Sequence, residues 1–252
     1  MKYLMVFADY NDGRQLFFDQ YMSPRNVDYC YNHNCEYLEY TKKDTIQSFR
    51  DNFTWNKFKI VRDLVDSGFL KDGDVLTHID ADMCIVKPEL EIPCNKSFSY
   101  AIDSGNTHCM GMYSIKINDW TKQLLNNILD ETRYNYFKSV LTIHEAFGTL
   151  SSFWEEFREQ ASWYSLAGIK RHSWKPFWEF DNYGFHSTAF PEDTIYSLED
   201  LDTHVEVLPT EWNVTELEGE SNCQFLINKV KKDDVLIRHF AGGQPWRKEW
   251  FS

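Results

Sequence analysis

An amphipathic helical segment leads directly into a short apolar strand in the first third of this chain. Residues 54–67 carry apolar side chains at helical spacing and end at Gly68; these side chains are Phe58, Val61, Leu64 and Val65. Residues 74–79 then form a short apolar run of the kind found in buried strands. Helices that alternate with such strands predict an α/β fold, in which helices cover both faces of a mainly parallel sheet.

The same alternation extends over the rest of the chain. We expect further helices at residues 26–34, 120–130 and 145–157, and further strands at residues 2–8, 36–40, 98–102, 110–115, 205–208 and 235–237. The chain has 252 residues and contains no internal repeat or low-complexity linker. This length suits one α/β domain, so the sequence predicts a single domain over residues 1–252.

The charge balance argues against several classes of partner. Lys and Arg together number 26 and Asp and Glu 39, which gives a net charge of -13. A surface this acidic opposes binding to nucleic acid and to anionic membranes. No apolar stretch is long enough to span a bilayer, no export signal precedes the first strand, and the six cysteines form no C-x-x-C pair. We therefore expect a cytosolic enzyme with free thiols, located in the host cytoplasm if the chain is viral.

The predicted strand at residues 74–79 runs straight into two carboxylates, Asp80 and Asp82. On an extended backbone, residues at i and i+2 face the same way, so both side chains can bind one ion. Carboxylate oxygens suit Mn²⁺ or Mg²⁺. The alternative is a pair of solvated acids in a turn. Asp200 and Asp202 repeat the spacing, but no apolar strand precedes them, so we interpret them as part of a solvent-facing polar loop.

Residues 55–62 and 74–82 resemble the GT-A glycosyltransferases in their order and spacing. In that family a helix with a basic residue precedes a strand and a D-x-D motif, which binds a metal ion together with a nucleotide diphosphate. The chain looks closest to galactosyl- and xylosyltransferase-like enzymes and their viral or bacterial relatives. The resemblance implies a nucleotide-sugar half at residues 1–115. Residues 116–252 would then form the acceptor side and supply a C-terminal metal ligand.

The C-terminal block, residues 235–243, resembles the family's apolar strand and its His-Phe-x-Gly turn. The resemblance implies that His239 completes the metal sphere, and an imidazole ligand suits Mn²⁺ better than Mg²⁺. Gly242 would let backbone amides approach the diphosphate, and Arg247 could pair with phosphate oxygens. The alternatives are a partly buried histidine followed by a tight turn, and a solvated basic end.

Two further regions match the family's donor-binding positions. Lys57 corresponds to the basic helix residue that reaches the donor, although Arg62 is an alternative and both could simply face solvent. Asp9 and Tyr10 follow the first predicted strand, where the family holds base and ribose. Tyr10 could stack on the base and Asp9 could accept from its amide edge; an ordinary strand-to-loop turn is the alternative.

Two acidic residues are candidates for the reaction itself. Asp103 follows the predicted strand at residues 98–102, where the family contacts the hydroxyls of the donor sugar. Residues 109–116 then resemble the small-residue strand that backs the family's active site. Glu145 matches the position beside the anomeric carbon, but it precedes Ala146 where relatives often carry Gln. Asp103 could instead cap a turn, and Glu145 could stabilise a helix N-terminus.

These observations favour a metal-dependent glycosyltransferase. It would move a sugar from a nucleotide-sugar donor, most simply a UDP-sugar, to a glycan or glycoprotein acceptor. One alternative is a nucleotidyltransferase that makes a nucleotide-sugar, although residues 9–14 contain only one glycine where a phosphate loop would need more. Another is a non-catalytic sugar-binding or virion structural protein. A glycoside hydrolase is disfavoured, because carboxylates at i and i+2 are too close in sequence to flank a glycosidic bond.

Overall fold

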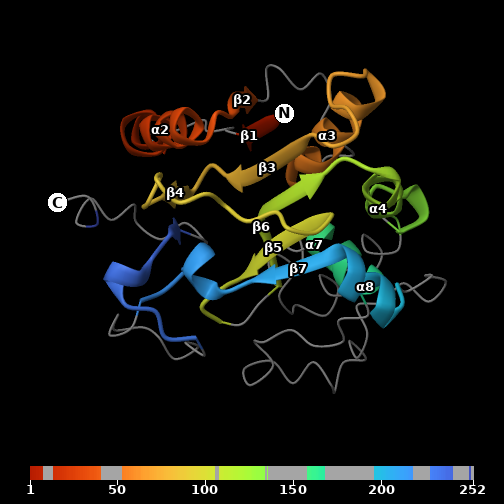
Figure 1. The fold of residues 1–252 in the computed structure, drawn as a ribbon. Coiled ribbons are helices and arrows are strands. Elements are labelled where there is room, and N and C mark those ends of the chain that lie inside the picture. The colour runs from red at the N-terminus through yellow and green to blue at the C-terminus, as the bar shows by residue number, and fades with distance from the viewer. Residues whose placement is uncertain are drawn as a thin grey trace. The chain divides into compact units, whose positions relative to one another are not determined.

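A computed structural model describes residues 1–7, 14–40, 53–105, 108–133, 135, 158–167, 196–217, 228–240 and 250 (Figure 1). The chain forms two compact units. The first comprises Met1–Ile46, Asp72–Lys116 and Glu206–Ser252. The second comprises Gln47–Lys71 and Ile117–Val205. No helix among the described residues combines the length and the apolar character needed to cross a bilayer.

A six-stranded sheet is the centre of the first unit. Its strand order is β2 (Glu36–Tyr40), β1 (Lys2–Phe7), β3 (Val75–Asp80), β6 (His108–Lys116), β5 (Phe98–Ile102) and β7 (Val205–Leu208). β1 pairs in parallel with β2 and β3, whereas β6 runs antiparallel to both β3 and β5. Among β2, β1, β3, β6 and β5, only β6 therefore runs against the others, which confirms the predicted α/β class with a mainly parallel sheet.

The central strands are buried on both of their faces. Leu4 and Met5 are neighbours on β1 and point to opposite faces, yet neither is exposed at all. On one face, Leu4 packs in a core cluster with Ile79 of β3 and Met112 of β6. The continuous apolar runs predicted from the sequence arise in this way, since a strand covered on both sides has no polar face.

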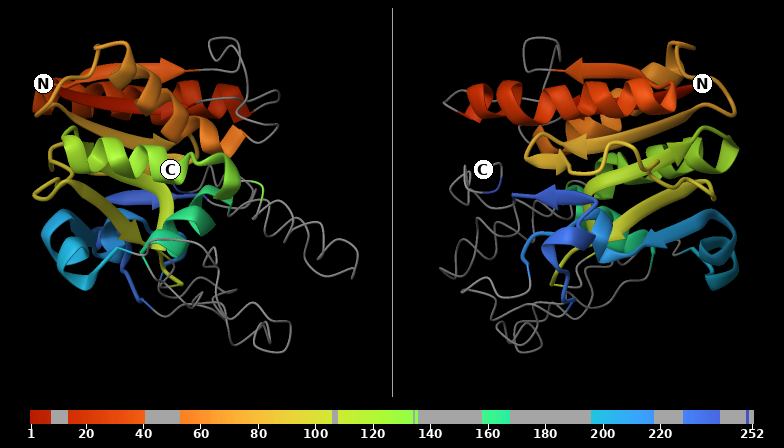
Figure 2. Two further views of the ribbon diagram at one scale, coloured as in Figure 1. Left: turned by 90° about the vertical axis from the view of Figure 1, so that its right-hand side faces the viewer. Right: turned by 60° about the vertical axis from the view of Figure 1, so that its left-hand side comes forward.

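The first unit's helical segment follows β1 in the chain and lies along β1 and β2 (Figure 2). It consists of α1 (Arg14–Phe17), a π-helix η1 (Phe18–Met22) and α2 (Ser23–His33). The predicted start of this helix at residue 26 was wrong by three residues. Pro24 occupies the first turn of α2, directly after the π-helical turn η1. Asn34 ends the helix in a left-handed conformation, and Cys35 N donates to Cys30 O at 2.9 Å.

A second, two-stranded sheet joins β4 (Met83–Ile85) to β8 (Ile237–His239). The strand predicted at residues 235–237 was wrong by two residues. A 3-10 turn, η7 (Lys232–Asp234), precedes Val235, and antiparallel pairing with β4 begins only at Ile237. His239 is therefore the last residue of the strand, opposite Met83.

The second unit consists of helices in its described part. They include η3 (Phe53–Trp55), α3 (Asn56–Asp66), α4 (Asp119–Ile128), α7 (Arg158–Leu166) and α8 (Leu198–His204). The predicted helices at residues 54–67 and 120–130 are confirmed as α3 and α4, and Asn118 caps α4. The helix predicted at residues 145–157 lies outside the described residues.

The interpretation of residues 200–202 as a loop was wrong, because they belong to α8. Ser197 is the N-cap, and its hydroxyl oxygen accepts from the Asp200 backbone N–H at 3.0 Å. Asp200 in turn accepts from the Ser197 N–H, which completes a capping box. No side chain of α8 is buried, so the expected solvent-facing position of Asp200 and Asp202 is confirmed.

The five cysteines in the described part of the chain are free thiols: Cys30, Cys35, Cys84, Cys94 and Cys109. Burial raises the pKa of the Cys30 and Cys84 thiols to about 12 and that of Cys94 to about 11. These three side chains are therefore neutral at physiological pH and act as small apolar groups.

Candidate metal centre

The two predicted carboxylate ligands lie where β3 turns into β4. Asp80 is the last residue of β3, and Asp82 lies in the turn immediately before β4. The pairing of Met83 with His239 places β8 beside this turn. The backbone N–H of Phe240 also donates to Asp82 O at 2.9 Å. Strand pairing therefore brings His239 to the two carboxylates from a distant part of the sequence.

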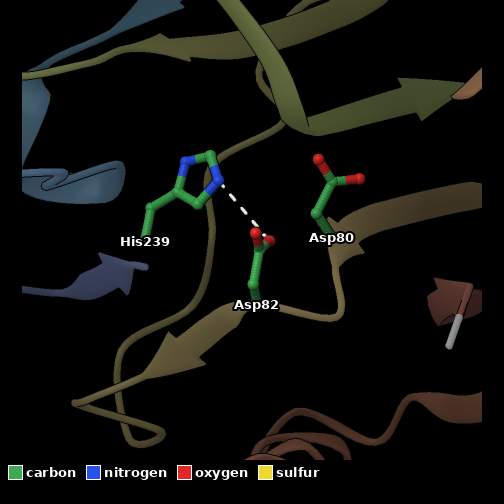
Figure 3. A group of neighbouring side chains, drawn as sticks. All are labelled: Asp80, Asp82 and His239. Atoms are coloured by element: carbon green, nitrogen blue, oxygen red, sulfur yellow. Dashed lines mark ion pairs between the residues drawn. The ribbon is translucent and has the colours of Figure 1, made fainter. Parts of the chain in front are cut away.

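Asp80, Asp82 and His239 converge on one point (Figure 3). One ligand atom from each side chain lies within 4.8 Å of the others. His239 Nε2 is 3.5 Å from Asp82 Oδ1. The Asp80 and Asp82 side chains are 34% and 29% exposed, whereas that of His239 is 8% exposed. Two partly open carboxylates and one buried imidazole thus form a three-sided site that faces solvent on its carboxylate side.

Asn213 fixes the ring of His239. Asn213 is completely buried, and its side-chain Oδ1 accepts from His239 Nδ1 at 2.9 Å. Since an amide oxygen cannot donate, the proton must sit on Nδ1, and in the neutral ring Nε2 then carries the lone pair. Metal-ligating histidines commonly donate their other N–H to a protein oxygen in this way. The tautomer therefore suits metal binding through Nε2.

The electrostatics of His239 combine two opposing effects. Burial lowers the pKa of the imidazole, but the Asp82 carboxylate and the neighbouring Cys109 thiol raise it, and the net result is a pKa well above the ordinary value. A positive charge on the His239 imidazole is thus favoured by the Asp82 carboxylate. A divalent cation would compete with the proton for the same position and would meet the same favourable field.

Gly111 provides the space in which the ligands meet. The register that pairs Ile79 with Met112 brings Gly111 opposite Asp80. A Cβ placed on Gly111 would lie 3.0 Å from Asp80 Oδ2 and 3.1 Å from His239 Cε1, closer than such contacts normally allow. The absence of a side chain at this position therefore leaves room for Asp80 and His239 to approach one another, and the residues present fit a bound divalent cation.

Gly111→Ala should weaken Mn²⁺ binding by about tenfold, which corresponds to ~1.4 kcal/mol. The added methyl group would push Asp80 and His239 apart by a few tenths of an ångström. Calorimetric Mn²⁺ titration measures the effect. Gly73→Ala is the matched control, since Gly73 has a φ of +88° and no heavy atom within 4 Å of an added Cβ, so it should lose stability without losing Mn²⁺ affinity. Equal Mn²⁺ affinity in Gly111→Ala and the wild type would contradict this role.

The structure describes two of the remaining candidate residues. Lys57 lies on α3 in the second unit, where its Nζ is 3.1 Å from Glu159 Oε1 of α7 and both side chains are nearly inaccessible. Asp103 follows β5 in the first unit and is buried. Its backbone oxygen accepts from Thr210 Oγ1 at 3.5 Å and from Asn228 Nδ2 at 3.1 Å. Their predicted contacts with a donor stay predictions.

Five candidate residues lie outside the described residues: Asp9, Tyr10, Glu145, Gly242 and Arg247. In contrast, His78 and Asn213 contact residues of the candidate metal centre without having been predicted. His78 could have been found, since it lies two residues before Asp80 on one strand and must share its face. No sequence motif marks Asn213, because it meets His239 only after separate segments of the chain have folded together.

No family model and no curated protein sequence matches this chain. Solved structures similar to it include two glycosyltransferases. A glycosyltransferase involved in glycosylation of the major capsid of PBCV-1 shares 10% identity over 96% of this chain and 94% of that chain, with a TM-score of 0.48. The glycosyltransferase GlyE of Streptococcus pneumoniae TIGR4 shares 11% identity over 85% of this chain and 76% of that chain, with a TM-score of 0.27. Neither similarity is strong enough to assign an activity, which has to come from the chain's own residues.

Proposed function

We propose that this protein is a metal-dependent glycosyltransferase, which moves a sugar from a nucleoside diphosphate sugar to a hydroxyl group of an acceptor. The observation that carries the proposal is the convergence of Asp80, Asp82 and His239, whose ligand atoms lie within 4.8 Å of one another. Open α/β sheets bind their ligands beyond the carboxyl ends of the strands, and Asp80 ends β3 at such a position.

The donor set favours a small, hard divalent cation with some affinity for nitrogen. Two carboxylates and one imidazole suit Mn²⁺, with Mg²⁺ as the alternative. The carboxylates are about one-third exposed, which leaves coordination positions open toward solvent for diphosphate oxygens. When bound, such a cation neutralises negative charge on the departing nucleoside diphosphate and so lowers the barrier to sugar transfer.

The charge of the whole chain supports the need for a cation. The net charge is -13, so an anionic donor meets a repulsive field. Asp80 and Asp82 add two negative charges at the centre itself. Without a cation, these carboxylates would repel a diphosphate placed beside them.

The remaining roles follow from the resemblance to GT-A enzymes and are part of the proposal. Asp9 and Tyr10 would hold the base and ribose of a UDP-sugar, and Lys57, Gly242 and Arg247 would approach its phosphates.

Asp103 would contact the donor sugar and Glu145 would act beside the anomeric carbon. The acceptor would be a glycan or a glycoprotein bound by residues 116–252. The cytosolic location expected from the sequence stays a prediction.

Calorimetry with UDP and other nucleoside diphosphates tests the metal requirement. Binding should be strong with Mn²⁺ and should disappear after treatment with EDTA, because the bare carboxylates repel the diphosphate. Equal affinity in both conditions would rule out the metal assignment.

A second experiment separates the possible functions. The protein is incubated with Mn²⁺ and a panel of nucleotide-sugars, and the products are identified. Release of nucleoside diphosphate indicates sugar transfer to water or to an acceptor. Formation of nucleotide-sugar from a nucleoside triphosphate and a sugar phosphate would instead indicate a nucleotidyltransferase, and binding without turnover would indicate a sugar-binding protein.

A further inference from the structure

His78 lies directly behind one of the metal-ligating carboxylates. It precedes Asp80 by two residues on β3, so both side chains are on the same face of the sheet. His78 is completely buried, and its Nε2 is 2.9 Å from Asp80 Oδ1. A carboxylate can only accept, so the proton of this hydrogen bond must belong to Nε2 of the imidazole.

The two oxygens of Asp80 therefore have different surroundings. Oδ1 accepts from His78. Oδ2 is the oxygen that lies 3.0 Å from the Cβ position of Gly111, and His239 Cε1 lies 3.1 Å from that same position. With Oδ1 held by His78, Oδ2 is the oxygen that borders the space at Gly111, which His239 Cε1 also borders.

The imidazole of His78 is itself held in place by the sheet. His78 is paired with Met5 of β1 on one side and with Tyr113 of β6 on the other. Its ring lies 5.2 Å from the ring of Tyr113 at an interplanar angle of 34°. A completely buried side chain packed beside an aromatic ring has little rotational freedom, so the direction of its N–H bond is fixed before any ligand binds.

We propose that His78 is a positioning residue of the metal centre: its Nε2–H donates to Asp80 Oδ1 and so presents Asp80 Oδ2 to the cation. The proposal rests on the metal site of the proposed function. Asp80 is one-third exposed, and this hydrogen bond fixes which of its two oxygens faces His78. Partners of this kind, which contact a ligand but not the metal, typically contribute 10- to 100-fold to metal affinity.

The test compares Mn²⁺ affinity among variants of the full chain, with Mn²⁺ alone as the probe and calorimetry as the measurement. His78→Leu removes the donor and should weaken Mn²⁺ binding by about 10- to 100-fold. His78→Gln should keep affinity within about threefold of the wild type, because its amide nitrogen can take the place of Nε2. His78→Asn has the same amide on a side chain one methylene shorter, so it should behave like His78→Leu.

Thr77→Val is the matched control. Thr77 is buried and precedes His78 on β3, so its side chain lies on the face of the sheet opposite to that of His78. On that face its Oγ1 lies 2.7 Å from Ser114 Oγ. The variant loses one buried hydrogen bond from the same strand without affecting Asp80. It should lower the melting temperature while leaving Mn²⁺ affinity unchanged.

Three outcomes would overturn the proposal. In the first, His78→Leu binds Mn²⁺ as tightly as the wild type. In the second, His78→Gln binds Mn²⁺ as weakly as His78→Leu, which would mean that the shape of the ring matters and not the donated hydrogen bond. If His78→Leu does not fold, equal affinities of His78→Gln and His78→Asn overturn it instead. A wild-type protein that binds no Mn²⁺ is a different result, since it removes the metal centre of the proposed function together with this role of His78.

Discussion

Asp82→Asn is expected to weaken the Mn²⁺-dependent binding of a nucleoside diphosphate by at least about a hundredfold. The substitution removes one of two negative charges from the site and replaces a strong ligand oxygen with a weak one. This loss should exceed the 10- to 100-fold loss of metal affinity that is typical when a residue that only orients a metal ligand is replaced. Because the Asp82 side chain is 29% exposed, the fold should tolerate the change.

His239→Ala should cause a loss of the same order, although His239 lies far from Asp82 in the sequence. The two residues share one ion in the proposed site, and the measurement is calorimetry with and without Mn²⁺. Circular dichroism should confirm that both variants are folded. Asp202→Asn is the matched control, since it makes the same change in the second Asp-x-Asp sequence, on the exposed helix α8. Wild-type Mn²⁺ affinity in His239→Ala would exclude His239 as the third ligand.

Glu145→Gln is expected to lower turnover by about 10²- to 10⁴-fold, the range typical of a lost general acid–base group. Glu145 lies outside the described residues, so this expectation comes from the resemblance to GT-A enzymes. Donor affinity should barely change, because the carboxylate would act at the reacting carbon and not on the diphosphate. Turnover, the donor dissociation constant and the melting temperature are measured on the same variant.

A purely structural Glu145 would give a different pattern. Loss of a carboxylate from a helix N-terminus costs up to ~1 kcal/mol of stability and leaves the chemistry unaffected. Unchanged turnover with a lowered melting temperature would therefore reject the catalytic role. Asp103→Asn would then be the next variant, because Asp103 is the other acidic candidate. The side chains of Thr210 and Asn228 donate hydrogen bonds to the backbone oxygen of Asp103. The substitution changes only the side chain, so it should leave those two hydrogen bonds intact.

The central elements of the fold could be predicted because their patterns are local. β1 and β3 are continuous apolar runs in the sequence, because both faces of the sheet are covered. α3 and α4 show apolar side chains at helical periodicity. β4 was not predicted, because three residues are too few to show a period. The position of β8 was missed by two residues because pairing with β4 sets its ends, and a local apolar run does not show where pairing begins.

The sequence by itself indicated that Asp80 and Asp82 share an ion, because two carboxylates directly follow an apolar strand. The extended backbone expected between them was wrong, since β3 ends at Asp80 and Asp82 lies in the turn before β4. Within β3, the two-residue period of a strand places His78 on the face of Asp80. The resemblance to GT-A enzymes named His239 as a third ligand, and only the tertiary structure decided how it reaches the two carboxylates and which other groups surround them. His239 arrives through the pairing of β8 with β4, and Asn213 and Gly111 arrive on other segments. These contacts join residues far apart in the chain, and no spacing along the sequence encodes where separate strands will pair.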